Sequence, residues 1–237
     1  MNHLTPILLK KFNLDNLYNQ LTLPKICIIG GPNTGKTRLI FNIIQKLDEL
    51  TDTKKTKAII ITPTDSHDKR YQNKFSFSYI YERFDMDIIK NIIKIKSENK
   101  NSQYLFVMDN CEAAKIKWQK DNKIKSILTS KNVNYILTMQ YAMYFEYNQY
   151  FDYIFILEDS IQISRKRIYE KHFKDIFETF QLFEDVFIPN TQNYKCIVLD
   201  NKNKLMYYYK AEEINTPLNN INTFDIIKYY KPFTITL

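Results

Sequence analysis

Short runs of apolar residues alternate with amphipathic stretches along this chain, and the two patterns predict strands and helices in turn. Continuous apolar runs are typical of strands buried on both faces of a parallel sheet. Such runs lie at residues 26–29, 58–62, 104–108, 133–139 and 152–157. Helical spacing or composition predicts helices at residues 39–50, 86–95, 112–131 and 164–183. Strands that alternate with helices in this order predict an α/β fold with a mostly parallel sheet flanked by helices.

The two ends of the chain follow a different pattern. Residues 195–209 form two apolar runs around a polar segment at 200–204, which predicts a C-terminal β-hairpin. Residues 1–24 are expected to be a short lead-in that ends at Pro24, and residues 212–237 a tail that runs over the surface. Since no repeat or linker interrupts the rest, residues 25–211 are predicted to be one domain.

The loop after the first predicted strand carries the clearest chemical signal. Gly30, Gly35, Lys36 and Thr37 fit the pattern G-x-x-x-x-G-K-[ST] of the phosphate-binding loop in P-loop NTPases. The whole chain contains three glycines, and all of them, with Gly31 as the third, lie in this loop. Glycine is needed where backbone amides curl around an anion. Strand, loop and helix in this order therefore predict a nucleoside triphosphate site.

Each part of this loop has an expected role. The backbone amides of the loop and of the following helix N-terminus are expected to hold the phosphates. These cofactor-binding residues are Gly30, Gly31, Pro32, Asn33, Thr34, Gly35, Lys36, Thr37 and Arg38. Lys36 is also predicted to be catalytic, because it reaches the β- and γ-phosphates, and Thr37 to place its hydroxyl on the metal. ATP and Mg²⁺ are the expected ligands.

A second motif ends the apolar run at residues 104–108. Asp109 follows this run directly, as in the Walker B motif, where a buried strand delivers an Mg²⁺-binding carboxylate at its carboxyl end. A turn aspartate is the plainer interpretation, but the P-loop upstream favours the catalytic and metal-binding one. One further strand is predicted between the two motifs. That order indicates the RecA-like (ASCE) branch of P-loop NTPases, which forms rings, rather than the small kinases.

Charge and cysteine content change this picture little. The net charge is +8, but five of the 34 basic residues are arginines, and abundant Lys, Asn, Ile and Tyr are typical of an AT-rich genome. The charge permits DNA binding without establishing it. The three cysteines are widely spaced, so neither a zinc site nor a disulfide framework is predicted, and a reducing compartment fits. No apolar run approaches the ~18 residues of a membrane-spanning helix.

With these motifs in place, the chain resembles the FtsK–HerA superfamily, and within it the genome-packaging ATPases of nucleocytoplasmic large DNA viruses and virophages, the poxvirus packaging-ATPase type. The likeness covers roughly residues 25–211. The matching stretches, in order, are 31–37 (GPNTGKT), 61–64 (ITPT), 106–111 (FVMDNC), 118–121 (WQKD), 138–141 (TMQY), 152–157 (DYIFIL), 165–170 (RKRIYE), 193–200 (NYKCIVLD) and 208–210 (YYK).

The resemblance implies an ATP-driven translocase that packages double-stranded DNA into a preformed capsid. It implies a homo-oligomeric ring, capsid or portal-type partner proteins, no membrane, and a location in the virion or in a viral factory of the host cytoplasm. Channel contacts to DNA phosphates would come from lysine-bearing loops, although a run of charges is more commonly a solvated helix face. The lysines concerned are Lys115, Lys117, Lys120 and Lys123.

The resemblance also assigns residue roles. Lys36 and Thr37 match the Walker A pair, Asp109 the Walker B aspartate, and Gln140 a glutamine after the fourth strand that senses the γ-phosphate or orients water. Gln140 can also be read as an ordinary hydrogen-bonding residue at a strand end. We count Lys36, Asp109, Glu112 and Gln140 as the catalytic candidates.

Two positions depart from the family pattern. Asn110 stands where relatives usually carry a second acidic residue as general base. Glu112 could take that role, or could be the first-turn acid of the next helix, and both interpretations stay open. Relatives also carry an arginine shortly before the strand at 152–157, which this chain lacks. Arg165 or Arg167 could act from a neighbouring subunit, or could be ordinary basic residues of a helix.

Two other functions remain open at this point. A small P-loop nucleoside or nucleotide kinase would use residues 164–170 as a lid helix that clamps phosphates. The strand order and the missing acceptor-binding arginines argue against it. A nucleotide-binding subunit with weak hydrolysis is the other, and both Asn110 and the missing arginine allow it.

Overall fold

The computed structural model describes residues 9–18, 24–50, 56–63, 69–71, 73–74, 80–83, 85–98, 103–111, 122–129, 133–140, 148–214 and 222–223. The chain divides into two compact units. Unit 1 contains Met1–Leu50 and Ile136–Asn215, and unit 2 contains Thr51–Tyr135 and Thr216–Leu237. Within the described residues, no helix is both long and apolar enough to cross a membrane.

The strands of unit 1 form a mixed sheet. Their order is β1 (Lys10–Lys11), β9 (Leu205–Lys210), β8 (Lys195–Asp200), β7 (Tyr153–Leu157), β2 (Ile26–Ile29) and β6 (Asn134–Met139, which starts at the end of unit 2). β2 pairs in parallel with β6 and with β7, so that Ile28 lies opposite both Thr138 and Phe155. β8 pairs antiparallel with β7 and with β9, and β1 pairs in parallel with β9. The predicted C-terminal hairpin is therefore confirmed as β8 and β9.

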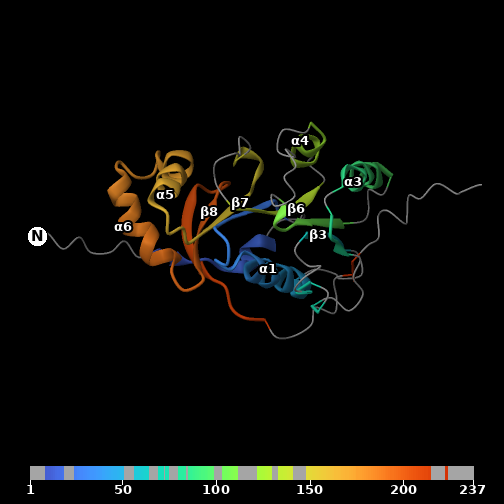
Figure 1. The fold of residues 1–237 in the computed structure, drawn as a ribbon, viewed down its shortest axis with the longest axis horizontal. Helices are drawn as coiled ribbons and strands as arrows, with labels where there is room; N and C mark the ends of the chain where they lie inside the picture. The colour runs from blue at the N-terminus through green and yellow to red at the C-terminus, as the bar shows by residue number, and fades with distance from the viewer. Residues whose placement is uncertain are drawn as a thin grey trace, which may run out of the picture. The chain divides into compact units, whose positions relative to one another are not determined.

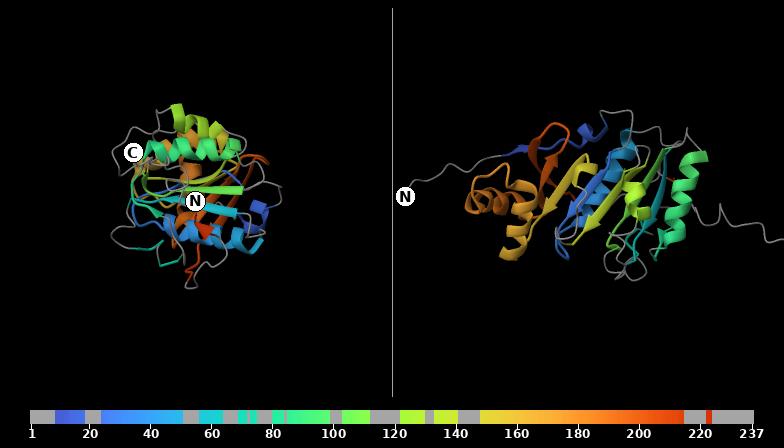
Figure 2. Two further views of the ribbon diagram at one scale, coloured as in Figure 1. Left: turned by 90° about the vertical axis from the view of Figure 1, so that its right-hand side faces the viewer. Right: turned by 90° about the horizontal axis from the view of Figure 1, so that it is seen from above.

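Burial explains why these apolar runs form strands. All four residues of β2 are at most 2% exposed, which requires cover on both faces of the sheet. Helix α1 (Lys36–Leu50) lies along one face of this sheet (Figures 1 and 2). Its buried stripe is at most 1% exposed and consists of Leu39, Ile40, Ile43, Ile44 and Leu47. The continuous apolar run thus predicted the strand, and the helical spacing of apolar residues predicted the helix, that flank the glycine-rich loop.

The predicted lead-in contributes to the core of unit 1. Phe12 is 1% exposed, and its ring packs against Tyr153, Phe155 and Tyr207 with centroids 5.4 to 5.8 Å apart. The 3-10 helix η1 (Leu14–Tyr18) contacts α1, where Lys46 Nζ lies 2.7 Å from the Asp15 carboxylate. A second 3-10 helix, η5 (Asn148–Tyr150), precedes β7.

The long helix predicted from Ser164 onward is wrong. The structure has helix α5 (Gln162–Ile168), a π-helical segment η6 (Tyr169–Phe173) and helix α6 (Phe180–Thr191), which is N-capped by the Thr179 side chain. The reason is aromatic packing: the ring centroids of Phe173 and Phe183 lie 4.9 Å apart, and those of Phe177 and Phe183 lie 6.1 Å apart. A straight helix would spread these side chains along its length, so the chain turns back to bring them together.

His172 lies beside this aromatic cluster. Burial, with a smaller contribution from the neighbouring Lys171, lowers the pKa of His172 to about 3. Its imidazole is therefore neutral at physiological pH.

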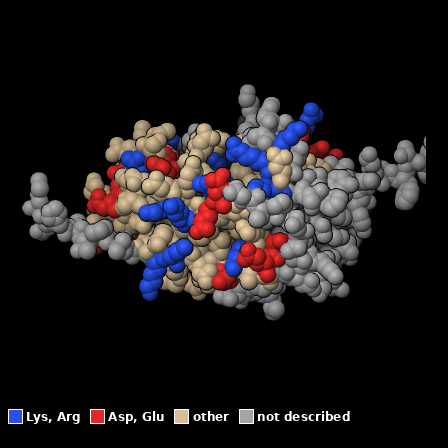
Figure 3. Space-filling view, turned by 90° about the horizontal axis from the view of Figure 1, so that it is seen from below, with Lys and Arg blue, Asp and Glu red and all other residues tan. Residues whose placement is uncertain are grey.

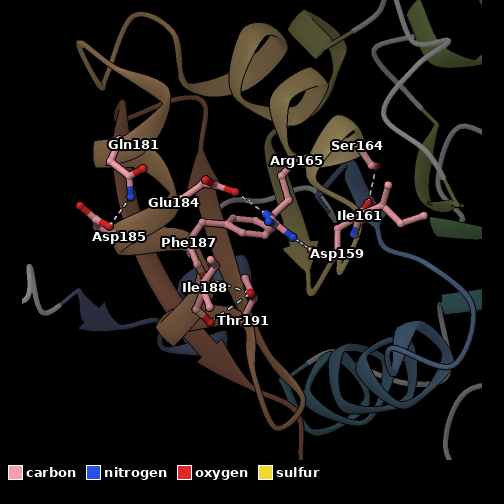
Figure 4. A network of polar contacts seen from close by, with 10 residues as sticks. All are labelled: Asp159, Ile161, Ser164, Arg165, Gln181, Glu184, Asp185, Phe187, Ile188 and Thr191. Carbon is pink, nitrogen blue, oxygen red and sulfur yellow. Dashed lines mark hydrogen bonds and ion pairs between the residues drawn. The ribbon is translucent and has the colours of Figure 1, made fainter.

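A polar network joins α5 to α6 (Figure 4). Asp159 accepts hydrogen bonds from the backbone N–H of Ile161 and from the Ser164 hydroxyl. Arg165 donates through Nη1 to the Asp159 carbonyl at 3.0 Å and through Nε to Glu184 Oε1 at 2.7 Å. The side chains of Arg165 and Glu184 are 14% and 10% exposed. This charge pair is thus largely removed from water, unlike an ordinary surface ion pair.

Replacing Arg165 with alanine is expected to lower the free energy of unfolding by about 2 kcal/mol, because Glu184 keeps its burial and loses its partner. Urea denaturation measures this. Arg167→Ala is the control, since Arg167 lies on the same helix but is exposed, and it should change stability by less than about 0.5 kcal/mol. A double variant with methionine at positions 165 and 184 should recover part of the loss. Equal effects at Arg165 and Arg167 would contradict the assignment.

Unit 2 contains the second set of parallel strands. β3 (Thr56–Ile61) pairs in parallel with β5 (Gln103–Met108), and Ile61 lies opposite Met108. The short strands β4 (Ile80–Tyr81) and β10 (Asn222–Thr223) also pair in parallel with β3. Helices α3 (Met86–Glu98) and α4 (Asn122–Thr129) lie side by side in Figures 1 and 2 and contact each other. Of the helix predicted at 112–131, residues 112–121 and 130–131 lie outside the described residues.

The fold class predicted from the sequence is confirmed. Parallel pairing of β2 with β6 and β7, and of β3 with β5, gives a mostly parallel sheet flanked by helices. The antiparallel strands β8 and β9 form the hairpin near the C-terminus. In parallel α/β sheets, ligands bind at the carboxyl ends of the strands, so these ends are the place to look for a site.

Candidate active site

The glycine-rich loop connects the carboxyl end of β2 to the N-terminus of α1. Gly35 has a φ of 102°, in the left-handed region that favours glycine. A Cβ at this position would also lie 2.9 Å from Tyr194 Cδ1, and one at Gly30 would lie 2.7 Å from the Thr34 hydroxyl. Gly30 and Gly35, two of the chain's three glycines, thus occupy positions where a side chain would clash. The loop has the compact backbone expected of a phosphate-binding nest.

Lys36 folds back over this loop. Its Nζ donates hydrogen bonds to the carbonyl oxygens of Gly30 at 2.8 Å and Gly31 at 2.7 Å, and the residue is 8% exposed. Thr34 donates to the Gly31 carbonyl at 2.9 Å, which braces the loop from within. The ammonium group is therefore held inside the loop by carbonyl oxygens. Phosphate oxygens are stronger acceptors for a cation and can replace them.

The remaining P-loop residues lie at the tip of the loop and in the first turn of α1. Thr37 and Arg38 are half-buried in the first turn of α1, at its positive end, while Pro32 and Asn33 are exposed at the tip of the loop. Asn33 has a φ of 59°. This left-handed conformation is one that asparagine adopts more readily than most residues.

Gln140 follows the carboxyl end of β6 and belongs to the same unit as the P-loop. The Gly30 N–H donates to the carbonyl of Met139, the preceding residue, at 3.0 Å. Gln140 is half-buried. Unit 1 thus brings the backbone of Gln140 close to the start of the P-loop, a position that the nucleotide-sensing interpretation requires and the hydrogen-bonding interpretation allows.

Asp109 belongs to unit 2, where it follows β5. It is 2% exposed, and its backbone N–H donates to the Ile61 carbonyl at 2.9 Å. The Tyr71 hydroxyl donates to Asp109 Oδ2 at 3.0 Å, and Tyr71 is 1% exposed. A buried carboxylate oriented by a buried phenol is a fixed acceptor rather than a freely rotating turn residue.

Asn110 and Glu112 decide where a general base could come from. Asn110 has a φ of 56°, so the chain bends in the left-handed region directly after Asp109. Asparagine suits this conformation. Glu112 lies outside the described residues. It therefore remains a candidate both for the general base and for the first-turn acid of the next helix.

Tyr71 and Tyr194 were not identified from the sequence as site residues. Tyr71 lies in the predicted polar loop at 64–74, and no local pattern marks it. Tyr194 is part of a stretch that resembles the packaging ATPases, but it lies 157 positions after Thr37 (194 − 37). Its ring packs against Arg38, with the guanidinium carbon 4.3 Å from the ring centroid. The contacts of Tyr71 with Asp109 and of Tyr194 with Arg38 join residues far apart in the sequence, so no local pattern records them.

The arginine candidates can now be placed. Arg165 is engaged with Glu184 and with the Asp159 carbonyl inside unit 1, which favours its interpretation as a structural residue of the helix. Arg167 is exposed on the same helix.

Comparison with known proteins places the chain in a family. Residues 16–138, just over half of the 237 residues, match the model of the AAA domain family. The chain belongs to the AAA domain family. This membership, with the P-loop of unit 1, confirms the predicted P-loop ATPase. A relative of this AAA domain protein is the uncharacterized protein L437 of Acanthamoeba polyphaga mimivirus, 27% identical over 234 residues, which cover 88% of this chain and 80% of the relative.

Solved structures share the fold of this AAA domain protein. The genome packaging NTPase B204 of Sulfolobus turreted icosahedral virus 2, in complex with AMPPCP, matches with a TM-score of 0.60 and 14% identity over 80% of this chain and 98% of that one. The DNA-packaging ATPase B204 of Sulfolobus turreted icosahedral virus matches with a TM-score of 0.57 and 16% identity over the same shares. These matches confirm the resemblance to viral genome-packaging ATPases at the level of the fold.

Proposed function

We propose that this chain is an ATP-driven translocase that packages double-stranded viral DNA into a preformed capsid. The observation that carries the proposal is the P-loop of unit 1, with Lys36 held over its carbonyl oxygens, in a chain whose fold matches viral packaging NTPases. The B204 protein binds AMPPCP, an analogue of ATP, which supports ATP as the nucleotide here. Residues 25–211 are the proposed ATPase domain.

The residues present suit ATP with Mg²⁺. Mg²⁺ prefers hard oxygen ligands, and Thr37 in unit 1 and Asp109 in unit 2 each offer one, a hydroxyl and a carboxylate. When bound, Mg²⁺ supplies positive charge against the β- and γ-phosphates. Lys36 exchanges its loop carbonyls for phosphate oxygens, and the backbone N–H groups of the loop tip and of the first turn of α1 hold the phosphate chain. Gln140 senses the γ-phosphate or orients the attacking water. Glu112 accepts the proton of that water if it takes the general-base role; without such a base, Asn110 makes hydrolysis slow.

The partners follow from the packaging role. We propose a homo-oligomeric ring that encloses DNA, contacts capsid or portal-type proteins, and works in the virion or a viral factory in the host cytoplasm. The viral origin of the relative supports this setting. On the face in Figure 3, basic and acidic side chains are interspersed over the described residues. The net charge of +8 therefore does not by itself identify a DNA-binding face.

The kinase alternative gains no support from residues 164–170. Ser164 donates its hydroxyl to Asp159, and Arg165 donates to Glu184 and to the Asp159 carbonyl, so both side chains hold the helical segment together. A phosphate-clamping lid needs such groups to be available for its substrate. We therefore propose no acceptor substrate.

Steady-state ATP hydrolysis by the full chain, with and without double-stranded DNA, tests the proposal. DNA should stimulate turnover, and the stimulation should fall steeply between about 50 and 200 mM salt, because contacts to phosphates release counterions. Lys36→Ala serves as the blank. Phosphate transfer to an added nucleoside without any response to DNA would replace the motor with a kinase.

A further inference from the structure

Tyr194 places an aromatic ring directly beside the P-loop. The residue lies in the turn between α6 and β8, and its Cδ1 would be 2.9 Å from a Cβ built on Gly35. The Arg38 guanidinium carbon lies 4.3 Å from the ring centroid. Despite these contacts, Tyr194 is 47% exposed. An accessible aromatic surface therefore borders the loop that holds the phosphates.

The backbone of this turn is unusual for a tyrosine. Asn193 and Tyr194 have φ values of 56° and 62°, so two successive residues are left-handed. Asparagine adopts this conformation readily, whereas a bulky aromatic residue does so at a cost. The Ala211 N–H donates to the Tyr194 carbonyl at 3.0 Å, and the Lys195 N–H donates to that of Gln192 at 3.1 Å. The fold thus maintains a strained conformation that keeps the ring on the P-loop.

Arg38 also pairs with an acidic side chain in a different direction, one that is itself 71% exposed. Its Nη2 lies 2.9 Å from Glu213 Oε2, in the segment that follows β9. The same segment is held to α1 by Asn42, which donates to the Glu212 carbonyl at 2.8 Å and accepts from the Glu212 N–H at 2.8 Å. Burial raises the pKa of Tyr209, whose hydroxyl stays protonated and donates to Asn42 Oδ1 at 2.9 Å. The Arg38–Tyr194 pair is therefore preorganised by α1 and by both ends of the hairpin.

We propose that Tyr194, backed by Arg38, is the platform on which the base of the bound nucleotide stacks. The inference rests on the proposed function, because it needs a nucleotide in the P-loop. One ribose separates the base of a nucleotide from its phosphates, so the base must lie close to the residues that border the loop. Aromatic rings and guanidinium groups both stack on nucleobases. Since every base has a π-face, the platform accepts adenine and guanine with little discrimination.

Calorimetric titration of the full chain with Mg·ATP, Mg·GTP and inorganic tripolyphosphate tests this platform. Tyr194→Asn removes the ring but suits the left-handed backbone, so it is preferable to alanine. It should weaken ATP and GTP binding by about 10- to 100-fold. Tripolyphosphate, which has no base, should bind as it does to the unmodified chain. Tyr194→Phe should restore nucleotide binding, because the stacking ring is kept.

The outcomes separate the platform from the proposed function. Equal weakening of ATP and tripolyphosphate by Tyr194→Asn would mean that the ring only supports the conformation of Gly35, and would overturn the platform. Unchanged ATP binding in Tyr194→Asn, while Lys36→Ala weakens both ligands, would overturn the platform and leave the P-loop site intact. An unmodified chain that binds neither ATP nor tripolyphosphate would overturn both proposals. Thermal denaturation of each variant confirms that it is folded.

Discussion

Replacing Lys36 with alanine is expected to reduce ATP hydrolysis at least about a hundredfold, the usual cost of removing one donor aimed at transition-state charge. The side chain is 8% exposed and its Nζ is held 2.8 and 2.7 Å from two carbonyl oxygens of the loop. If the loop binds phosphates as proposed, the ammonium group is already close to them, and little rearrangement is needed to use it. The measurement is phosphate release under saturating ATP and Mg²⁺, with and without DNA.

Lys46→Ala is the matched control for this experiment. Lys46 lies on the same helix, where its half-buried side chain pairs with the more exposed Asp15 at 2.7 Å and Glu49 at 3.3 Å. Such surface pairs contribute between about 0 and 1 kcal/mol, so this variant should hydrolyse ATP normally. If both lysine variants kept full activity, Lys36 would only stabilise the conformation of the loop. The catalytic role assigned to Lys36 would then be wrong.

Strands and helices such as β2 and α1 could be predicted, because the pattern of apolar and polar residues within each segment determines them. The β2 run is buried on both faces and α1 has a single buried stripe, so each leaves a distinct periodicity. The broken helix from Ser164 could not be predicted, because the reason for the break is the contact between Phe173 and Phe183, whose ring centroids are 4.9 Å apart. The spacing of apolar residues alone does not distinguish one continuous helix from two helices that are separated by aromatic residues.

The candidate site shows the same limit. The site residues predicted from motifs lie within one loop or shortly after the end of a strand, which a linear pattern records. Tyr71 and Tyr194 act on those residues from distant parts of the chain, and a single tyrosine in a polar loop has no periodicity to detect. Contacts between a site residue and a residue far away in the sequence depend on the path of the loops in the folded chain. They can therefore be found only from a structure.

Tyr71 also makes the Asp109 assignment testable in a specific way. Asp109→Asn keeps the shape of the side chain and an oxygen that can accept the Tyr71 hydroxyl, but it removes the charge. If Asp109 helps to hold Mg²⁺, hydrolysis should fall at least about a hundredfold at every Mg²⁺ concentration, because metal stabilisation of charge is worth several kcal/mol. Nucleotide binding without metal should change little, since it depends on the P-loop.

Tyr71→Phe should have a smaller and different effect. It removes the hydrogen bond that orients the carboxylate, so about tenfold more Mg²⁺ should be needed for half-maximal turnover, while the maximal rate stays close to that of the unmodified chain. A magnesium titration of both variants distinguishes loss of a ligand from loss of its orientation. If Tyr71 had only a structural role, Tyr71→Phe would lower stability without changing the Mg²⁺ concentration needed for half-maximal turnover.

Asp200→Asn is the control that separates a metal-binding aspartate from an ordinary one. Asp200 also ends a strand and is 5% exposed, but its carboxylate accepts from the N–H groups of Lys202 and Asn203 in the hairpin turn. Its replacement should lower stability by about 1 kcal/mol and leave the magnesium dependence unchanged. Should Asp109→Asn behave like Asp200→Asn, Asp109 would be a turn residue after a buried strand. The metal would then have to be held by Thr37, phosphate and water.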